Sequence, residues 1–178
     1  MTSEIDSDVD RFYEIYATSY RNIGTPVLPK RYFGAVKQIF ADACSIVTII
    51  EKGRAVSSVL SFCFRDTVLP TYGAGTERAR TVAANDFMYW EVMRYAHARQ
   101  LAWFDFGRSK VNSGSFEFKK NWGFEPEPLV YSYYLRGRSK LPDINPLNPK
   151  YRAFIWLWKR LPLSLSKVIG PPIARGIG

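Results

Sequence analysis

The stretch Cys44–Gly75, "CSIVTIIEKGRAVSSVLSFCFRDTVLPTYGAG", decides the fold of this 178-residue chain. Its β-branched and aromatic residues fall into three runs separated by short polar turns, a pattern typical of antiparallel strands. The turn 51–54 contains a glycine and predicts a hairpin between the first two runs. Because the third run is interrupted at Gly73 and Gly75, we expect the third strand to break there.

Helices are predicted before and after these strands in the sequence. Apolar residues at helical spacing indicate one helix over residues 9–24, a second after Pro29 and a third over residues 85–99. In the third helix, Trp90 widens the apolar stripe enough to predict burial on two sides. The expected order continues with a short strand at 101–106, a short helix after Ser113 and a last strand, "LVYSYYLR", at 129–136.

Composition limits the class of protein. A chain of this length that is 47% hydrophobic can bury one sizeable core. Cys44 and Cys63 lie in apolar runs without metal-ligand spacing, so we expect small buried residues in a reducing compartment. His97 is the single histidine, and we therefore expect neither a metal site nor a histidine-based triad. No secretory pattern and no membrane-length apolar run is found, which predicts a cytoplasmic protein.

The net charge of +9 is concentrated in the C-terminal part of the chain. Residues 136–178 carry nine Lys or Arg residues and one acidic residue, a net charge of +8. We therefore divide the chain into a nearly neutral domain (1–138), a Pro/Asn-rich linker (139–150) and a basic aromatic tail (151–178). Rings and cations mixed in this way suit an anionic surface, so residues 146–178 are expected to contact the inner face of the cytoplasmic membrane. A helix packed on the domain, or contact with RNA, are the alternatives.

The loop Gly107–Ser115 leaves the end of a strand and enters a helix N-terminus, where free N–H groups attract anions. Arg108 and Lys110 strengthen the positive potential, and Ser109 and Ser113 add hydroxyl groups. The loop has neither the Walker spacing nor a GxGxxG pattern. It is therefore either a plain strand–helix turn or an anion or acyl-donor site that these four residues would contact.

Two carboxylates are candidate bases. Asp105 ends the strand beside this loop and could accept the proton of a reacting amine, with hydrogen bonding to the loop as the alternative. Glu91 lies in the middle of a helix, where an ion pair to a basic residue is the alternative. Lys119 lies among aromatic residues, although a lysine next to Lys120 on a short helix is ordinarily solvated.

Five stretches resemble, in the same order, the C-terminal half of the FemAB-related proteins associated with PEP-CTERM/exosortase systems. They are "GTPVLPKRYF", "YWEVM", "FDFGRSK", "FEFKKNWGFEPEPL" and "LPDINPLNPKYRAFIWLWKRLP". The resemblance runs from about Phe12 to the end of the chain. It implies an α/β (α+β) GNAT-like acyltransferase fold, with a mixed, mostly antiparallel central sheet flanked by helices. FemAB-like enzymes contain two such domains and this chain contains one, so a homodimer or a missing tandem domain is an implied partner.

The resemblance also implies roles for particular residues. Peptidyltransferases of the wider family move an amino acid from aminoacyl-tRNA to an amine of a peptidoglycan precursor, and Phe118-Lys119 matches their Phe-Lys pair. Lys119 would then stabilise the oxyanion of a tetrahedral intermediate. Phe118 and Trp122 would line the substrate site, together with Tyr72, which falls where GNAT-like folds separate two central strands.

We therefore expect an N-acyltransferase or aminoacyltransferase that forms an amide on an amine of a cell-envelope or exopolysaccharide precursor. No cofactor is expected to bind tightly, and the donor is an acyl-CoA, an acyl carrier or an aminoacyl-tRNA. GNAT acetyltransferases usually have a tyrosine where Lys119 stands, and their Gln/Arg-x-x-Gly-x-Gly/Ala loop is absent from "GAGTERARTVAAND". Both departures argue against acetyl-CoA. An acyl-CoA-dependent N-acetyltransferase, and a non-catalytic fragment or subunit that binds saccharide, lipid or tRNA, are the alternatives.

Overall fold

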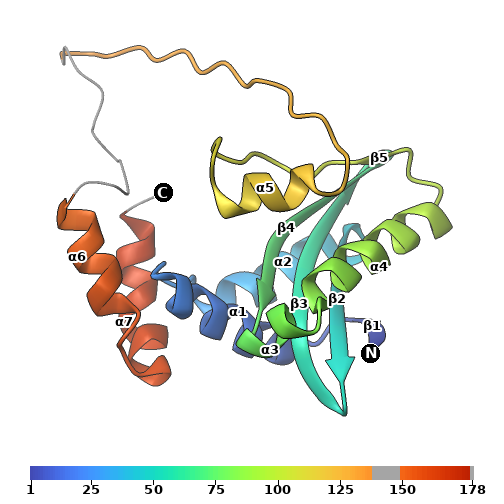
Figure 1. Ribbon diagram of the computed structural model, residues 1–178, viewed down its shortest axis with the longest axis horizontal. Helices are drawn as coiled ribbons and strands as arrows, with labels where there is room; N and C mark the ends of the chain where they lie inside the picture. The colour runs from blue at the N-terminus through green and yellow to red at the C-terminus, as the bar shows by residue number, and fades with distance from the viewer. Residues whose placement is uncertain (138–148, 177–178) are drawn as a thin grey trace.

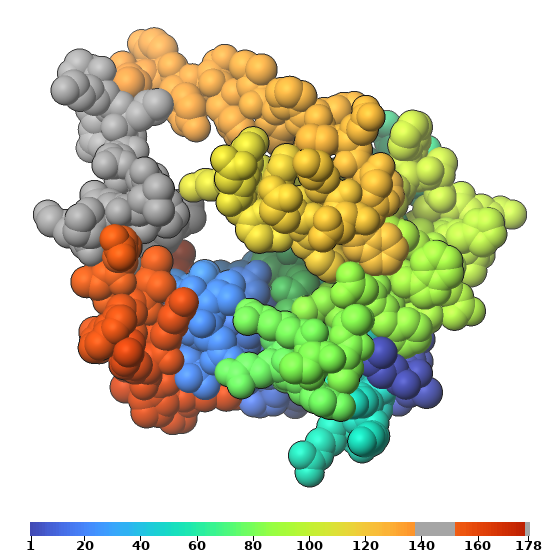
Figure 2. All heavy atoms as spheres, viewed as in Figure 1, coloured from blue at the N-terminus to red at the C-terminus, as the bar shows by residue number. Residues whose placement is uncertain are grey.

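The computed structural model describes residues 1–137 and 149–176 (Figures 1 and 2). Its centre is a five-stranded sheet in the order β1-β2-β3-β4-β5. The strands are β1 (Thr2–Asp6), β2 (Cys44–Glu51), β3 (Arg54–Phe64), β4 (Thr67–Gly75) and β5 (Trp103–Phe104). Neighbouring strands are antiparallel except β4 and β5, which are parallel. The predicted α/β fold with a mixed, mostly antiparallel sheet is thus confirmed.

Helices cover both faces of the sheet (Figure 1). They are α1 (Val9–Ile23), α2 (Lys30–Phe40), α3 (Glu77–Thr81), α4 (Ala84–Ala98), α5 (Gly114–Lys120), α6 (Pro149–Trp158) and α7 (Leu163–Arg175), with a 3-10 turn η1 (Ala41–Ala43). The three long helices predicted before residue 100 are confirmed, and so are the hairpin, the third strand and the short helix after Ser113. Local periodicity was sufficient for these elements because each has a continuous buried stripe.

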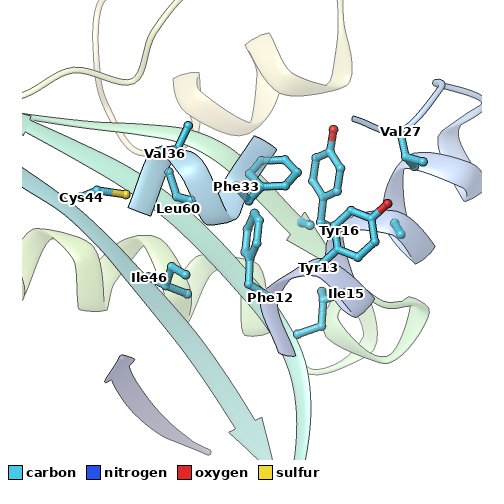
Figure 3. Packing of buried hydrophobic residues seen from close by; sticks show 12 residues of the cluster. Phe12, Tyr13, Ile15, Tyr16, Val27, Phe33, Val36, Cys44, Ile46 and Leu60 are labelled. Atoms are coloured by element: carbon cyan, nitrogen blue, oxygen red, sulfur yellow. The ribbon is translucent and has the colours of Figure 1, made fainter. Parts of the chain in front are cut away.

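The core consists of two apolar clusters, one on each face of the sheet. Successive strand residues point to opposite faces. Ile46 of β2 therefore packs with Phe12 and Phe33 under α1 and α2 (Figure 3), while Val47 packs with Met88 under α4. This two-sided burial explains why β2 is almost continuously apolar rather than alternating.

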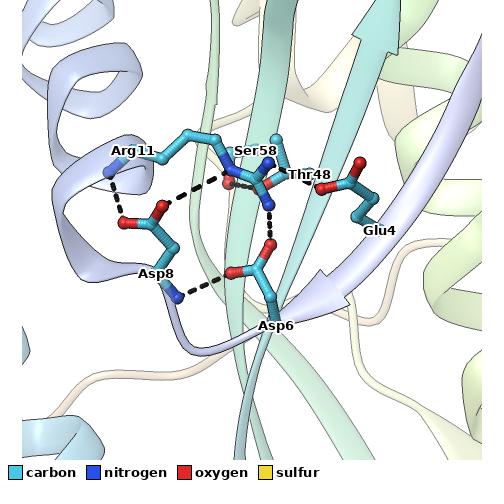
Figure 4. Close-up of polar contacts among 6 residues, drawn as sticks. All are labelled: Glu4, Asp6, Asp8, Arg11, Thr48 and Ser58. Carbon is cyan, nitrogen blue, oxygen red and sulfur yellow. Dashed lines mark hydrogen bonds and ion pairs between the residues drawn. The ribbon is translucent and has the colours of Figure 1, made fainter.

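A polar network attaches β1 to α1 (Figure 4). The guanidinium of Arg11 pairs with Glu4 at 2.6 Å and also with Asp6, and the Asp8 side chain accepts a hydrogen bond from Arg11 N at 2.9 Å as the N-cap of α1. β1 was not predicted, because its residues are largely polar and exposed. Its place in the sheet depends on pairing with β2, which lies far along the sequence.

Three details of the sequence prediction are wrong. Strand β4 does not break at Gly73, because Gly73 pairs with Val59 and the strand continues to Gly75. Trp90 is 51% exposed, so α4 is buried on one side only. Residues 129–135 form no strand, since none of the described residues pairs with them and Val130 remains 91% exposed.

The C-terminal tail forms α6 and α7, and α7 packs on α1. Lys167 Nζ pairs with Glu14 at 2.5 Å, and Trp158 is buried with only 2% of its surface exposed. This is the packed-helix alternative that the sequence left open. The predicted linker 139–150 lies outside the described residues except for the start of α6 at 149–150. Within the described ranges, no helix combines the length and apolarity needed to cross a bilayer.

Gly170 sits at the closest approach of α7 to the domain. A Cβ at this position would lie 2.8 Å from Val27 Cγ2 and 2.9 Å from Val27 N. Gly170→Ala should therefore lower the free energy of unfolding by about 1–3 kcal/mol and expose α7 to proteolysis. Gly34, on α2, has open space around it, so Gly34→Ala should stabilise by about 0.5–1 kcal/mol. Urea unfolding and limited proteolysis measure both; equal behaviour of the two variants would contradict the close packing of α7.

Candidate active site

Strands β4 and β5 separate after a short paired region. Thr67 and Val68 pair with Trp103 and Phe104, and Asp105 N donates to Val68 O at 2.9 Å. Beyond this point β4 continues to Gly75, while the segment that follows β5 leaves the sheet. Among the described residues, no strand pairs with β4 on its β5 side over residues 69–75, and this unpaired edge is called the gap between β4 and β5 below.

The same part of β4 contains a β-bulge. Leu60 pairs with Tyr72 and Ser61 with Pro70, so Thr71 has no partner on β3. A bulge bends a strand and redirects neighbouring side chains, and bulges are common beside active sites. The bulge at Thr71 was not predicted, although a proline inside a strand, here Pro70, is a signal for such an irregularity.

An aromatic cluster holds α5 over this gap. The ring centroid of Tyr89, on α4, lies 5.4 Å from that of Phe106 and 5.3 Å from that of Phe118. The ring centroids of Phe106 and Phe124 are 5.0 Å apart. A Cβ on Gly73 would be 3.2 Å from Tyr89 Oη, so the glycine lets the tyrosine lie against β4. Burial raises the pKa of Tyr89, which keeps its hydroxyl neutral. Of these residues, only Phe118 was predicted for the site.

Lys119 projects from α5 onto the loop that follows β5. Its Nζ donates to Gly107 O at 3.0 Å and to Arg108 O at 3.3 Å. Burial lowers the pKa of the ammonium, and the negative charge of Asp105 partly offsets that change. The amine is therefore half-buried and held in place, with one N–H left for another acceptor. An ordinary solvated lysine would show neither property.

The predicted loop residues gather around Lys119 but differ in their availability. Asp105 Oδ1 accepts a hydrogen bond from Gly107 N at 2.6 Å, which is the structural role left open by the sequence. Ser113 caps α5 by accepting from Phe116 N at 3.3 Å and donates to Lys110 O at 2.6 Å. Both residues are therefore already engaged in shaping the loop.

At three other loop positions, the side-chain charge or hydroxyl group is not used to shape the loop. Arg108 is exposed and donates to Tyr131 Oη at 3.3 Å, and Lys110 is also exposed. The hydroxyl of Ser109 is buried and has no hydrogen-bond partner among the described residues. The loop whose carbonyls hold the Lys119 amine thus carries two exposed cations and one buried hydroxyl without a partner among the described residues.

Of the other candidates, Tyr72 and Glu91 lie apart from this cluster, whereas Trp122 N donates to Lys119 O at 3.1 Å. Tyr72 packs on the opposite face of the sheet, where its hydroxyl shares a 2.9 Å hydrogen bond with Tyr32 and burial raises its pKa. Trp122 follows α5 and is half-buried. Glu91 lies under β1 at the far edge of the sheet, bonded to Ser3 Oγ at 2.6 Å and to Arg94 at 2.9 Å, as its ion-pair alternative predicts.

His97 and Cys44 have the structural roles expected from the sequence, whereas Cys63 is only half-buried rather than buried. His97 is exposed in the last turn of α4, and both cysteines are free, with Cys44 buried. Over residues 1–137 and 149–176, no cluster of His, Cys, Asp or Glu side chains could hold a metal ion.

The segment after β4 does not form a diphosphate cradle. Residues 76–83 contain no glycine and include α3 (Glu77–Thr81), whose N-terminus is capped by the Thr76 side chain. Acidic residues occupy the first turns of α3 (Glu77) and α4 (Asp86), where they compete with a bound anion. The Asn85 side chain also fills the space beside Gly75. These residues do not fit the diphosphate of coenzyme A.

Comparisons with known proteins place the chain among acyltransferases. The profile of the acetyltransferase (GNAT) domain family matches residues 2–120. No curated protein sequence matches the chain. Similar solved structures include the aminoglycoside acetyltransferase AAC(6')-Iy in complex with the bisubstrate analogue CoA-S-monomethyl-acetylneamine (14% identity, 76% of this chain and 99% of that chain, TM-score 0.60).

Two further structures have the same fold. A ribosomal-protein-alanine N-acetyltransferase from Brucella melitensis biovar Abortus 2308 shares 12% identity over 76% of this chain and 99% of its own, with a TM-score of 0.58. The aminoglycoside acetyltransferase meta-AAC0020 from an uncultured soil metagenomic sample, in complex with trehalose, shares 9% identity over 75% of this chain and 97% of its own, with a TM-score of 0.60. Together with the parallel β4–β5 pair, the family match confirms the GNAT-like fold and the acyltransferase class implied by the resemblance. The chain belongs to the acetyltransferase (GNAT) domain family.

Proposed function

We propose that this chain is a FemAB-like domain that transfers an acyl or aminoacyl group to an amine of a cell-envelope or exopolysaccharide precursor. The observation that supports this most strongly is the half-buried Lys119 amine, held on two loop carbonyls beside the gap between β4 and β5. An amine that attacks an ester or thioester carbonyl produces an oxyanion. A fixed ammonium with few water neighbours stabilises that charge more strongly than a solvated one.

The protein's own groups account for binding and charge stabilisation. Arg108 and Lys110 would hold an anionic donor, and Lys119 would direct its remaining N–H at the carbonyl oxygen. The aromatic rings of Phe106 and Phe118 would exclude water from the reacting group. Asp105 is exposed beside the loop and stays the predicted acceptor of the proton that the amine loses.

The donor is best matched by an aminoacyl ester or an acyl carrier. The lack of a diphosphate cradle after β4 disfavours acetyl-CoA. An acyl-CoA-dependent N-acetyltransferase is the second candidate, supported by the similar AAC(6')-Iy structure in complex with CoA. A saccharide amine is the proposed acceptor. A second copy of the chain or a tandem domain would complete a cleft of the two-domain FemAB type.

Product analysis separates these proposals. Purified protein is incubated with an amino-sugar peptidoglycan precursor and either aminoacyl-tRNA or acetyl-CoA, and amide products are measured by mass spectrometry. We expect amide product when the donor is aminoacyl-tRNA and no product when the donor is acetyl-CoA. Product only when the donor is acetyl-CoA would favour the second candidate, the acyl-CoA-dependent N-acetyltransferase. Ligand retention without product from either donor would make the chain a binding module.

The rate should also fall at alkaline pH. If the ammonium form of Lys119 is required, activity is present below its pKa and is lost as the pH rises through it. Burial lowers that pKa, so the loss should begin at a lower pH than for an exposed lysine. A guanidinium does not titrate in this range, and Lys119→Arg should therefore move the alkaline limb of the pH–rate profile upward. An unshifted limb would mean that another group titrates.

A further inference from the structure

Helices α6 and α7 lie at one end of the molecule (Figures 1 and 2), and both carry exposed large apolar residues. On their inner side, Trp158 is buried and a Cβ on Gly24 would contact Ile155. Four other large apolar residues of the two helices remain exposed. This tail surface consists of Trp156 (57% exposed), Leu157 (57%), Leu165 (43%) and Val168 (71%). Single exposed apolar residues are ordinary, but four large ones within two short helices make the tail a candidate docking surface.

The charged residues within α6, α7 and their connection have one sign. Residues 149–176 contain six Lys or Arg residues and no Asp or Glu. Lys167 is used in the ion pair with Glu14, whereas Arg152, Lys159 and Arg160 are exposed. Uncompensated cations beside exposed apolar residues favour an anionic partner surface and disfavour the core of a protein interface, where lysine is depleted.

Arg160 and Trp156 form a unit suited to a lipid interface. The guanidinium lies 3.7 Å from the centroid of the Trp156 ring and donates to Trp156 O at 3.0 Å. The cation is thereby held next to an exposed indole ring, which is the amphipathic side chain most favoured at headgroup depth. A guanidinium is also more weakly hydrated than an ammonium, and its planar set of donors matches the geometry of a phosphate.

We propose that α6 and α7 dock this protein on an anionic lipid bilayer. Trp156 and Leu157 enter the headgroup region, and Arg152, Lys159 and Arg160 contact lipid phosphates. The helices have 10 and 13 residues, too few to span the bilayer, so they lie in its plane. Docking does not depend on the proposed acyl transfer. It would bring the domain to lipid-linked acceptors, because α7 also contacts α1.

Vesicle sedimentation of the full chain tests the docking. At about 0.1 M salt, the protein should bind vesicles of phosphatidylcholine with about 30% phosphatidylglycerol and not vesicles of phosphatidylcholine alone. The double variant Lys159→Gln/Arg160→Gln should lower the partition coefficient about 30-fold. Its matched control is Arg31→Gln/Lys52→Gln, which removes two exposed cations elsewhere and should have little effect.

The apolar contribution has its own matched pair. Trp156→Ser should lower the partition coefficient about tenfold, while Trp90→Ser, which removes an exposed tryptophan from α4, should leave it unchanged. Circular dichroism checks that each variant is folded, and the comparison of anionic with neutral vesicles needs no variant at all.

Three results would overturn the proposal. The first is equal binding of the wild-type protein to neutral and anionic vesicles. The second is a wild-type dimer that Trp156→Ser dissociates in analytical ultracentrifugation, which would assign the tail surface to a second copy. The third is tRNA binding that Lys159→Gln/Arg160→Gln abolishes, without any vesicle binding by the wild-type protein.

Discussion

Replacing Lys119 with alanine should lower the turnover of amide formation by about 10² to 10³-fold, the effect of losing one oxyanion donor. The reason is positional. Its Nζ is fixed on Gly107 O and Arg108 O beside the gap between β4 and β5. The measurement is kcat and KM for the aminoacyl-tRNA reaction. Lys120→Ala is the matched control, because Lys120 is the next residue on α5 and is exposed.

The two functions of Lys119 can be separated in the same experiment. If the side chain only holds the loop, its loss should raise KM and leave kcat almost unchanged; if it stabilises the oxyanion, kcat itself should fall. Lys119→Met keeps the apolar stem and removes the charge, so it should behave like Lys119→Ala in kcat. Turnover within about twofold of wild type would remove Lys119 from the mechanism.

Replacing Phe33 with alanine should lower the free energy of unfolding by about 3–5 kcal/mol. Phe33 is fully buried, and its ring centroid lies 5.1 Å from that of Phe12, 4.7 Å from Tyr16 and 5.2 Å from Tyr72. The cavity left behind would lie among rigid rings that cannot easily collapse into it (Figure 3).

Urea unfolding measures this loss. Ile39→Ala is the matched control, since Ile39 belongs to the same helix and is 75% exposed; its effect should stay within about 0.5 kcal/mol. A loss at Phe33 that is no larger than the loss at Ile39 would contradict the packing of α2 on the sheet.

The elements that could be predicted are those with local signals. Helices α1 and α2 have buried stripes at helical spacing, and β2 and β3 are β-branched runs joined by a glycine-containing turn. Ser113 was predicted to precede α5 and does cap it. Each of these outcomes depends on residues within a few positions of one another.

Elements with nonlocal causes were missed or misplaced. The residues of β1 are largely polar, and they form a strand because their backbone pairs with the edge of β2. The segment 129–135 has a strong β-pattern, yet none of the described residues provides it with a paired edge. A strand must satisfy its backbone groups through a neighbour, so the strand pattern alone does not decide whether a strand forms.

The candidate site shows the same division. The sequence by itself identified the loop 107–115 and Lys119 within an aromatic segment, because composition and short motifs are local. Only the tertiary structure placed Tyr72 on the opposite face, brought Tyr89 to Phe118 and set the Lys119 amine on the loop carbonyls. Tertiary structure also packed α7 on α1, since the contacts that choose a face, a bulge or a docking helix join residues far apart in the chain.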